Sequence, residues 1–124
     1  MHPTVARLGR LSNGIHTEMA QTVRVYLELR ACGVTDCEIR AHLHQPEMLD
    51  LALAYEAAHP VVLIDGPNVG ERYQCGRPRP SVVELIAYNR VVVRHRDGSH
   101  DALRIHLFDQ AADPPVFQRV CGRH

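Results

Sequence analysis

Residues 33–53 read Gly-Val-Thr-Asp-Cys-Glu-Ile-Arg-Ala-His-Leu-His-Gln-Pro-Glu-Met-Leu-Asp-Leu-Ala-Leu, and the expected fold is built outward from them. Thr35 and Glu38 have the spacing of a capping box, in which two side chains satisfy backbone amides at the start of a helix. Pro46 suits the first position of a second helix, where its missing N–H costs nothing. The stretch therefore predicts a short helix, a tight turn and a longer helix over residues 46–59.

The flanking sequence predicts one more helix and a hairpin. Apolar residues recur at close to helical spacing over residues 16–31, with Thr17 as the N-cap and Gly33 in a left-handed turn after the helix. The apolar run 61–64 predicts a strand, and six residues rich in turn formers separate it from a second predicted strand, 71–75. Three helices are thus expected to be followed by a two-stranded hairpin.

This order of elements resembles a winged helix-turn-helix domain. The resemblance rests on residues 33–43, on residues 46–53 and on the return strand that begins Glu71-Arg72-Tyr73. It covers residues 16–76, which leaves residues 1–15 as an N-terminal arm. The fold class it implies is α+β, with a three-helix winged helix-turn-helix core.

Residues 77–124 are expected to form a C-terminal extension. Residues 90–96 and 102–108 flank Asp97-Gly98-Ser99, a tight-turn signal, and predict a β-hairpin. For residues 81–88 the pattern fits a helix and a strand equally well. We expect the extension to pack on the core or on a second subunit, since winged-helix regulators commonly form homodimers.

The resemblance implies a transcriptional regulator that binds duplex DNA, with helix 46–59 in the major groove. In this interpretation the residues nearest the bases are Gln45, Glu47 and Asp50, and those on phosphates are Arg72, Arg77 and Arg79. The helix departs from the family pattern because it carries three carboxylates and no Arg or Lys. A carboxylate near phosphates costs free energy, so the positioning cations must come from the flanking segments.

The distribution of charge supports an alternative function. The 124 residues carry 14 basic side chains, all of them arginine, and 14 acidic ones, and the zero net charge excludes a generic basic nucleic-acid binder. Residues 31–60 hold one arginine against five carboxylates. The alternative is a protein-binding module, such as a phage or mobile-element inhibitor, that uses the winged-helix scaffold or a second face. Strand alternation assigns four residues to that face: Arg94, Arg96, Arg104 and His106.

A third interpretation is a small ribonuclease in which His95, His100 or His106 act as acid and base beside arginines. Nothing in the sequence orders these histidines into a site. Residues 62–68 are similar to the metal-binding first strand of PIN-type nucleases, but too few residues follow them for that domain. The sequence holds no nucleophile elbow, P-loop, dinucleotide fingerprint or zinc-protease motif. We therefore expect a protein without enzymatic activity and without a cofactor.

The cysteines and apolar runs indicate the environment of the chain. Cys32 and Cys37 with Cys121 and His124 match the ligand count of a zinc site, but the first pair straddles a helix end, so no metal is expected. The four cysteines do not form a secreted disulfide framework, and no apolar run is long enough to span a membrane. We expect a cytoplasmic protein without a membrane partner. The use of arginine in place of lysine suggests a high-GC bacterial or phage genome.

Overall fold

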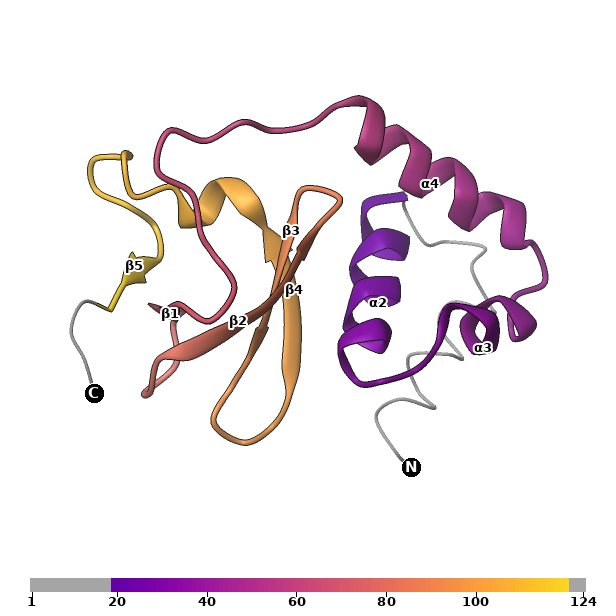
Figure 1. Cartoon of the computed structure of the whole chain (residues 1–124), viewed down its shortest axis with the longest axis horizontal. Helices are drawn as coiled ribbons and strands as arrows, with labels where there is room; N and C mark the ends of the chain where they lie inside the picture. Colours follow the sequence, from indigo (N-terminus) through magenta and orange to yellow (C-terminus); the bar gives the residue numbers. More distant parts are fainter. Residues whose placement is uncertain (1–18, 121–124) are drawn as a thin grey trace. The chain divides into compact units, whose positions relative to one another are not determined.

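The computed structural model describes residues 19–120, which fall into a helical unit ending at His59 and a sheet unit beginning at Pro60 (Figure 1). Within residues 19–120, no helix is both long and apolar enough to cross a membrane. Four predicted features lie outside the described residues: the N-terminal arm 1–15, the N-cap Thr17, and the zinc ligands considered at Cys121 and His124.

Within residues 19–59 the helical unit has three helices, and their positions confirm the predicted helices: α2 (Met19–Ala31), α3 (Asp36–Ala41) and α4 (Pro46–Ala58). Gly33, after α2, has a φ of 92°, the left-handed conformation that glycine adopts without a steric cost. Thr35 Oγ1 accepts a hydrogen bond from the backbone N of Glu38 at 3.2 Å. The predicted N-cap of α3 is therefore confirmed.

Helix α4 buries one face and exposes another. Leu49, Ala52 and Leu53 are buried and form an apolar stripe. Met48 and Tyr55 are also apolar, but they are 50% and 55% exposed. Because successive helical residues are about 100° apart, these two side chains lie on the side of the helix away from the buried stripe.

A chain of hydrogen bonds joins the three helices. Tyr26 Oη of α2 donates to Asp36 Oδ1 at 2.6 Å, and Arg40 Nε of α3 donates to Asp36 Oδ2 at 2.6 Å. Arg40 Nη1 also lies 2.7 Å from Asp50 Oδ1 of α4. Since the short helix α3 supplies the two central groups, this chain ties α3 to both of its longer neighbours.

The sheet unit contains five strands in the order β4-β3-β2-β1-β5. The neighbouring strands are antiparallel throughout. The elements are β1 (Arg72–Gln74), β2 (Ser81–Ala87), β3 (Arg90–Arg94), β4 (His100–Arg104), the 3-10 helix η1 (Ile105–Phe108) and β5 (Gln118–Arg119). The segment for which the sequence left helix and strand open is therefore strand β2.

The expected fold class is wrong, because the five-stranded sheet makes up the larger structured part and the chain is not a three-helix core with a hairpin extension. Residues 61–64 form no strand, so they do not pair with residues 71–75 as predicted. Strand β1 pairs instead with β2 and β5, and Tyr73 at its centre is fully buried. The physical reason is that an isolated two-stranded hairpin is marginally stable, whereas pairing on both sides encloses Tyr73 in a sheet.

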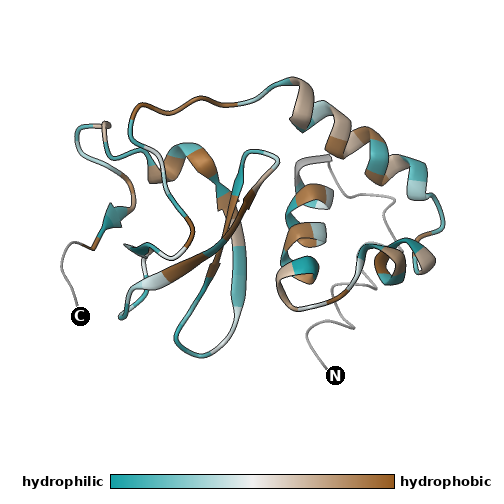
Figure 2. Ribbon diagram, viewed as in Figure 1, coloured by the Kyte–Doolittle hydropathy of each residue, from teal (hydrophilic) through white to brown (hydrophobic). Residues whose placement is uncertain are grey.

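Residues 60–71, the first of the sheet unit, run as irregular chain, and Figure 2 shows an apolar stretch in them after α4. The second half of this segment is held by Arg119 of β5. The Arg119 guanidinium donates to Asp65 Oδ1 at 3.0 Å, to the carbonyl of Gly66 at 3.1 Å and to Tyr73 Oη at 3.0 Å. The turn-rich residues thus lie against the sheet without forming a wing.

The hairpin predicted around Asp97-Gly98-Ser99 is confirmed as β3–β4. Its second strand is shorter than predicted, because residues 105–108 form η1. Phe108, the last residue of η1, is fully buried. A further hairpin, β2–β3, turns at Tyr88-Asn89, where φ is 51° and 60°. The sheet is therefore built from two consecutive hairpins to which β1 and β5 are added.

The core of the sheet unit lies on one face of the sheet. Val83 and Val93 are paired across β2 and β3, and with Val91 they pack against Tyr73 and Phe108. The Tyr73 and Phe108 rings meet edge to face with centroids 5.1 Å apart, an arrangement that aromatic pairs favour. Side chains that alternate with these valines along β2 and β3 lie on the opposite face of the sheet.

Candidate functional site

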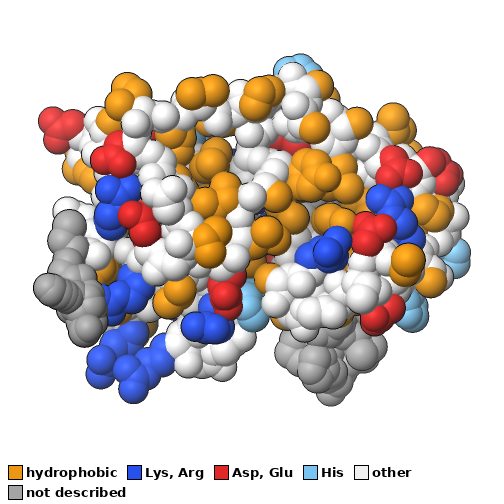
Figure 3. Space-filling model, in the orientation of Figure 1, with side chains coloured by type: hydrophobic (Ala, Val, Ile, Leu, Met, Phe, Trp, Pro, Cys, Tyr) orange, Lys and Arg blue, Asp and Glu red, His pale blue; other side chains and the backbone are white. Residues whose placement is uncertain are grey.

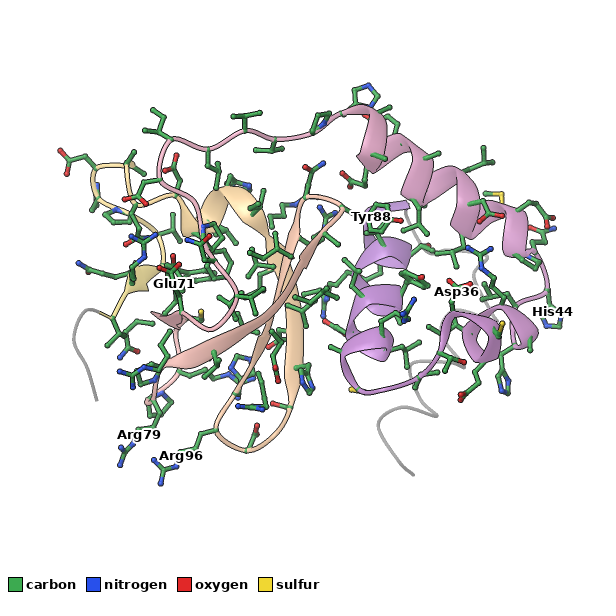
Figure 4. All side chains as sticks on the ribbon, in the orientation of Figure 1. Asp36, His44, Glu71, Arg79, Tyr88 and Arg96 are labelled. Carbon is green, nitrogen blue, oxygen red and sulfur yellow. The ribbon has the colours of Figure 1, made fainter. Side chains whose placement is uncertain are left out.

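Five arginines gather at one end of the sheet, and we call this set the arginine surface. They come from β1, from the loop between β1 and β2, from β3 and from the β3–β4 loop. The members are Arg72, Arg77, Arg79, Arg94 and Arg96. Figure 3 shows basic side chains gathered at this end of the sheet unit, and Figure 4 shows Arg79 and Arg96 projecting from it in the same direction.

Strand register aligns two members of this surface. Val82 of β2 pairs with Arg72 on one side and with Arg94 on the other. Paired residues point to the same face and strands lie about 4.8 Å apart, so the two arginines stand roughly 10 Å apart across β2. Together with Arg79 and Arg96 they line a pocket of about 300 Å³. Four arginines from three segments of the chain thus line one pocket.

The members differ in how their charges are balanced. Arg94 and Arg77 each lie beside a carboxylate, at N–O distances of 3.1 and 3.5 Å. Arg79 and Arg96 have no ion pair and no hydrogen bond with any residue between 19 and 120. An arginine keeps its charge at all physiological pH values and presents five N–H donors in a planar fork. These two side chains are therefore available to an anionic ligand.

A buried histidine lies beneath the arginine surface. The His95 residue is 4% exposed, and its ring Nδ1 and Nε2 are each 2.6 Å from an oxygen, of Ser81 and Asp101 respectively. Both ring nitrogens are thus engaged, one by the Ser81 hydroxyl and the other by the Asp101 carboxylate. Because Asp101 also lies beside Arg77, the network connects β2, β4 and two loops under the surface.

The order of these groups is that of a serine–histidine–aspartate triad, but their accessibility is not. Ser81 is fully buried, so its hydroxyl is closed to a substrate that approaches from solvent. The neighbouring thiol is also unsuited to nucleophilic attack, because burial raises the pKa of Cys75 to about 11. We therefore assign Ser81, His95 and Asp101 a positioning role.

The β3–β4 loop is ordered by its own residues. Asp97 Oδ1 accepts from the backbone N of Ser99 at 2.9 Å and from its hydroxyl at 2.6 Å. These hydrogen bonds lower the pKa of Asp97 below its ordinary value. Gly98 has a φ of 88°, which the turn requires. Arg96 thus directly precedes a turn that the hydrogen bonds between Asp97 and Ser99 keep in one conformation.

The structure joins residues that the sequence analysis assigned to two separate surfaces. Arg72, Arg77 and Arg79 were predicted to contact phosphates from the wing, and Arg94 and Arg96 were assigned to a second binding face. All five belong to the arginine surface, because β1, β2 and β3 are adjacent in the sheet. A local sequence pattern cannot predict that these three strands are neighbours in the sheet.

The other two members of the predicted second face lie elsewhere. Arg104 pairs with Arg90 beside the β2–β3 turn, whereas Arg94 pairs with His100 at the opposite end of the same two strands. The separation is four residues of strand, roughly 13 Å. His106 is exposed but belongs to η1. The strand alternation on which this face was predicted therefore ends at Arg104.

The predicted base-contacting residues belong to the helical unit. Gln45 is the N-cap of α4, and Glu47 stands in its first turn; both are exposed. The Asp50 carboxylate binds Arg40. They lie in a different unit from Arg72, Arg77 and Arg79, the three arginines predicted to contact phosphates.

His95 and His100, considered for ribonuclease activity, have side-chain partners within residues 19–120, and two of the four ligands considered for zinc, Cys121 and His124, lie outside that range. Both ring nitrogens of His95 are occupied, and His100 Nε2 lies 3.5 Å from a carboxylate oxygen of Glu84. Cys32 and Cys37 are exposed. Among residues 19–120, no group of three or more His, Cys, Asp and Glu side chains could hold a metal ion.

Sequence reasoning missed Ser81 and Asp101. A signal for Asp101 was present in the turn Asp97-Gly98-Ser99, since a hairpin centred there places the start of its second strand beside His95. Ser81 carried no comparable signal, because residues 81–88 fitted a helix as well as a strand.

Comparisons with protein-family models, with curated proteins and with solved structures gave no match.

Proposed function

We propose that the chain is a non-enzymatic nucleic-acid-binding protein whose arginine surface contacts the phosphates of duplex DNA. The observation that carries this proposal is the pair Arg79 and Arg96, which have no partner among the described residues and stand beside a pocket lined by further arginines. A guanidinium group can donate two parallel hydrogen bonds to the oxygens of one phosphate, and each such contact releases counterions from the DNA. Local charge thus supports binding in a chain whose net charge is zero.

A regulatory role remains part of the proposal. The short helix α3, residues 42–45 and the longer helix α4 follow one another as a helix, a turn and a helix. Base contacts are proposed for Gln45 and Glu47, which are exposed at the start of α4. Asp50 is less suited to this role because its carboxylate is already bound by Arg40.

Fluorescence anisotropy with a labelled duplex, recorded over a series of salt concentrations, tests the proposal. We expect Arg79→Ala and Arg96→Ala each to weaken binding and to reduce the slope of log K against log salt by about one unit, because each removes one phosphate contact. Arg104→Ala is the matched control, since Arg104 is an exposed arginine at the other end of the sheet.

Two results would contradict the proposal. One is the absence of binding to duplex DNA at low salt. The other is an equal loss of affinity in the Arg79, Arg96 and Arg104 variants, which would show that the effect reflects total charge and not the arginine surface.

A second candidate function, protein binding, is favoured by one observation on α4. Met48, Leu51 and Tyr55 are 50%, 57% and 55% exposed and follow one another at helical spacing, so they form an apolar stripe. If this stripe binds a protein, Leu51→Arg abolishes the recovery of one stoichiometric partner from cell extract while Arg79→Ala does not. Recovery that is unaffected by Leu51→Arg rules out the stripe.

A further inference from the structure

Two pockets adjoin at the arginine surface and share part of their walls. The first, of about 300 Å³, is the one lined by Arg72 and Arg94. The second, of about 480 Å³, is lined by Pro78 and Asp97, and its lining is the more apolar of the two. Arg79 and Arg96 line both pockets, with His95. Arg79 and Arg96, which have no partner within residues 19–120, therefore stand between a basic pocket and a more apolar one.

From this pair of pockets we infer that the arginine surface binds an unpaired nucleotide, with its phosphate in the first pocket and its base in the second. The inference rests on the proposed function, and it narrows the ligand from a phosphate backbone to a strand end or an unpaired base. Both volumes lie within or near the range of pockets that hold small organic ligands.

The first pocket has the chemistry of a phosphate site. Four arginines line it, two of them, Arg72 and Arg94, from the strands that flank β2, and the Arg94 guanidinium also lies beside Glu84. A phosphate at a strand end carries more charge than one in the backbone, and it has more oxygens to accept paired N–H donors. A terminal phosphate should therefore bind in this pocket with a more favourable free energy than an internal phosphate.

The second pocket has the chemistry of a base site. Pro78 supplies an apolar wall, and the guanidinium planes of Arg79 and Arg96 stack on nucleobase faces as they do in single-strand recognition. Asp97 Oδ1 accepts both hydrogen bonds from Ser99, which leaves Oδ2 to accept from an exocyclic amino group. We expect cytosine, which has such a group, to be preferred over thymine, which has none.

The base must be unpaired because of how the two pockets are arranged. In a duplex, each base is covered on both faces by its neighbours and bonded along its edge to the opposite strand. A base that enters the second pocket while its phosphate lies in the first has to leave that stack, which costs least where the nucleotide is already unpaired. A strand end with one overhanging nucleotide meets this condition.

The test compares four labelled duplexes of one core sequence by fluorescence anisotropy with the full chain. They are a blunt duplex, a duplex with a 5′-phosphorylated overhanging cytidine, the same overhang without phosphate, and a phosphorylated overhanging thymidine. Stacking of one base is worth about 1–3 kcal/mol, so we expect the phosphorylated cytidine overhang to bind at least about fivefold more tightly than the blunt duplex. The affinities of the two other overhanging duplexes should lie between those of the blunt duplex and the phosphorylated cytidine overhang.

Lysine substitutions separate stacking from charge. Arg79→Lys with Arg96→Lys keeps both positive charges but removes the planar groups, so the preference for the unphosphorylated cytidine overhang over the blunt duplex, which depends on the base site alone, should disappear. Arg104→Lys, the matched control at the other end of the sheet, should retain that preference. Circular dichroism verifies that each variant is folded.

The possible failures are distinguishable. Equal affinity for the blunt and overhanging duplexes overturns this inference and leaves the proposed function standing. A preference that survives the double lysine substitution also overturns it, because the overhang then binds elsewhere. Absence of binding to all four duplexes overturns both the inference and the proposed function.

Discussion

At the scale of single residues, Asp36 connects hydrogen bonding to pH-dependent stability. A hydrogen bond from Tyr26, and then one from Arg40, lower the pKa of Asp36 below its ordinary value of 3.8. A carboxylate with a lowered pKa stabilises the fold above the pKa of the unfolded chain, and this contribution is lost as the pH falls through the folded value. Asp36 should therefore stabilise the helical unit at neutral pH but not in acid.

We expect Asp36→Asn to lower the free energy of unfolding by about 1 kcal/mol at pH 7, a value reduced because the carboxylate is partly exposed. The difference from the parent chain should shrink as the pH falls below about 3.8. Urea unfolding at several pH values measures both quantities. Glu47→Gln, which changes an exposed carboxylate of α4, serves as the control. A penalty that is the same at pH 7 and pH 3 would contradict the assignment.

Cys75 shows how burial controls the reactivity of a side chain. Desolvation raises the pKa of its thiol to about 11 from an ordinary 9.0, which lowers the thiolate fraction at pH 8 roughly a hundredfold. Cys32 and Cys37 are exposed. We expect iodoacetamide to modify these two much faster than Cys75, as followed peptide by peptide by mass spectrometry. All three rates should become similar in denaturant, and equal rates in the folded chain would contradict the burial of Cys75.

At the scale of elements, the β2–β3 turn carries a conformational cost. Tyr88 and Asn89 both have positive φ, as a two-residue type I′ turn requires, and Tyr88 is poorly suited to this conformation. Tyr88→Asn and Tyr88→Val both remove the ring, but asparagine tolerates the left-handed region and valine does not. We expect the asparagine variant to be more stable than the valine variant by about 1 kcal/mol, measured by thermal unfolding. Equal stabilities would indicate that the turn has another geometry.

The elements also show where sequence patterns were sufficient. Local signals predicted α2, α3 and α4, because a cap, a turn glycine and a helical repeat act over a few residues, as Thr35 and Gly33 illustrate. The Asp97-Gly98-Ser99 signal likewise predicted the β3–β4 hairpin. The apolar run 61–64 was assigned to a strand from its composition alone. It is irregular because β1, its expected partner, pairs with later strands.

At the scale of the whole molecule, the positive and negative charges are concentrated in different units of the chain. All five members of the arginine surface belong to the sheet unit, while the acidic stretch 31–60 lies almost entirely in the helical unit. The proposed phosphate contacts thus require only residues after His59. A chain with zero net charge can bind DNA in this way if its positive charge is concentrated in one unit.

We expect a fragment of residues 60–124 to retain most of the affinity for duplex DNA, and residues 1–59 alone to bind weakly or not at all. Anisotropy measures the affinity, and circular dichroism and NMR dispersion verify that the sheet fragment is folded. A folded sheet fragment without affinity for DNA would place the binding residues in the helical unit.

The sequence by itself predicted the three helices and the β3–β4 turn, and it singled out Arg72, Arg77 and Arg79 for phosphate contacts and Arg94 and Arg96 for a separate face. Each of these depends on residues close together in the chain or on composition alone. Only the tertiary structure decided that Arg72 and Arg79 stand beside Arg94 and Arg96, that Arg104 does not, and that His95 is buried under them. The physical reason is that strand pairing joins segments far apart in sequence, and the choice of partner depends on how completely the whole sheet buries residues such as Tyr73.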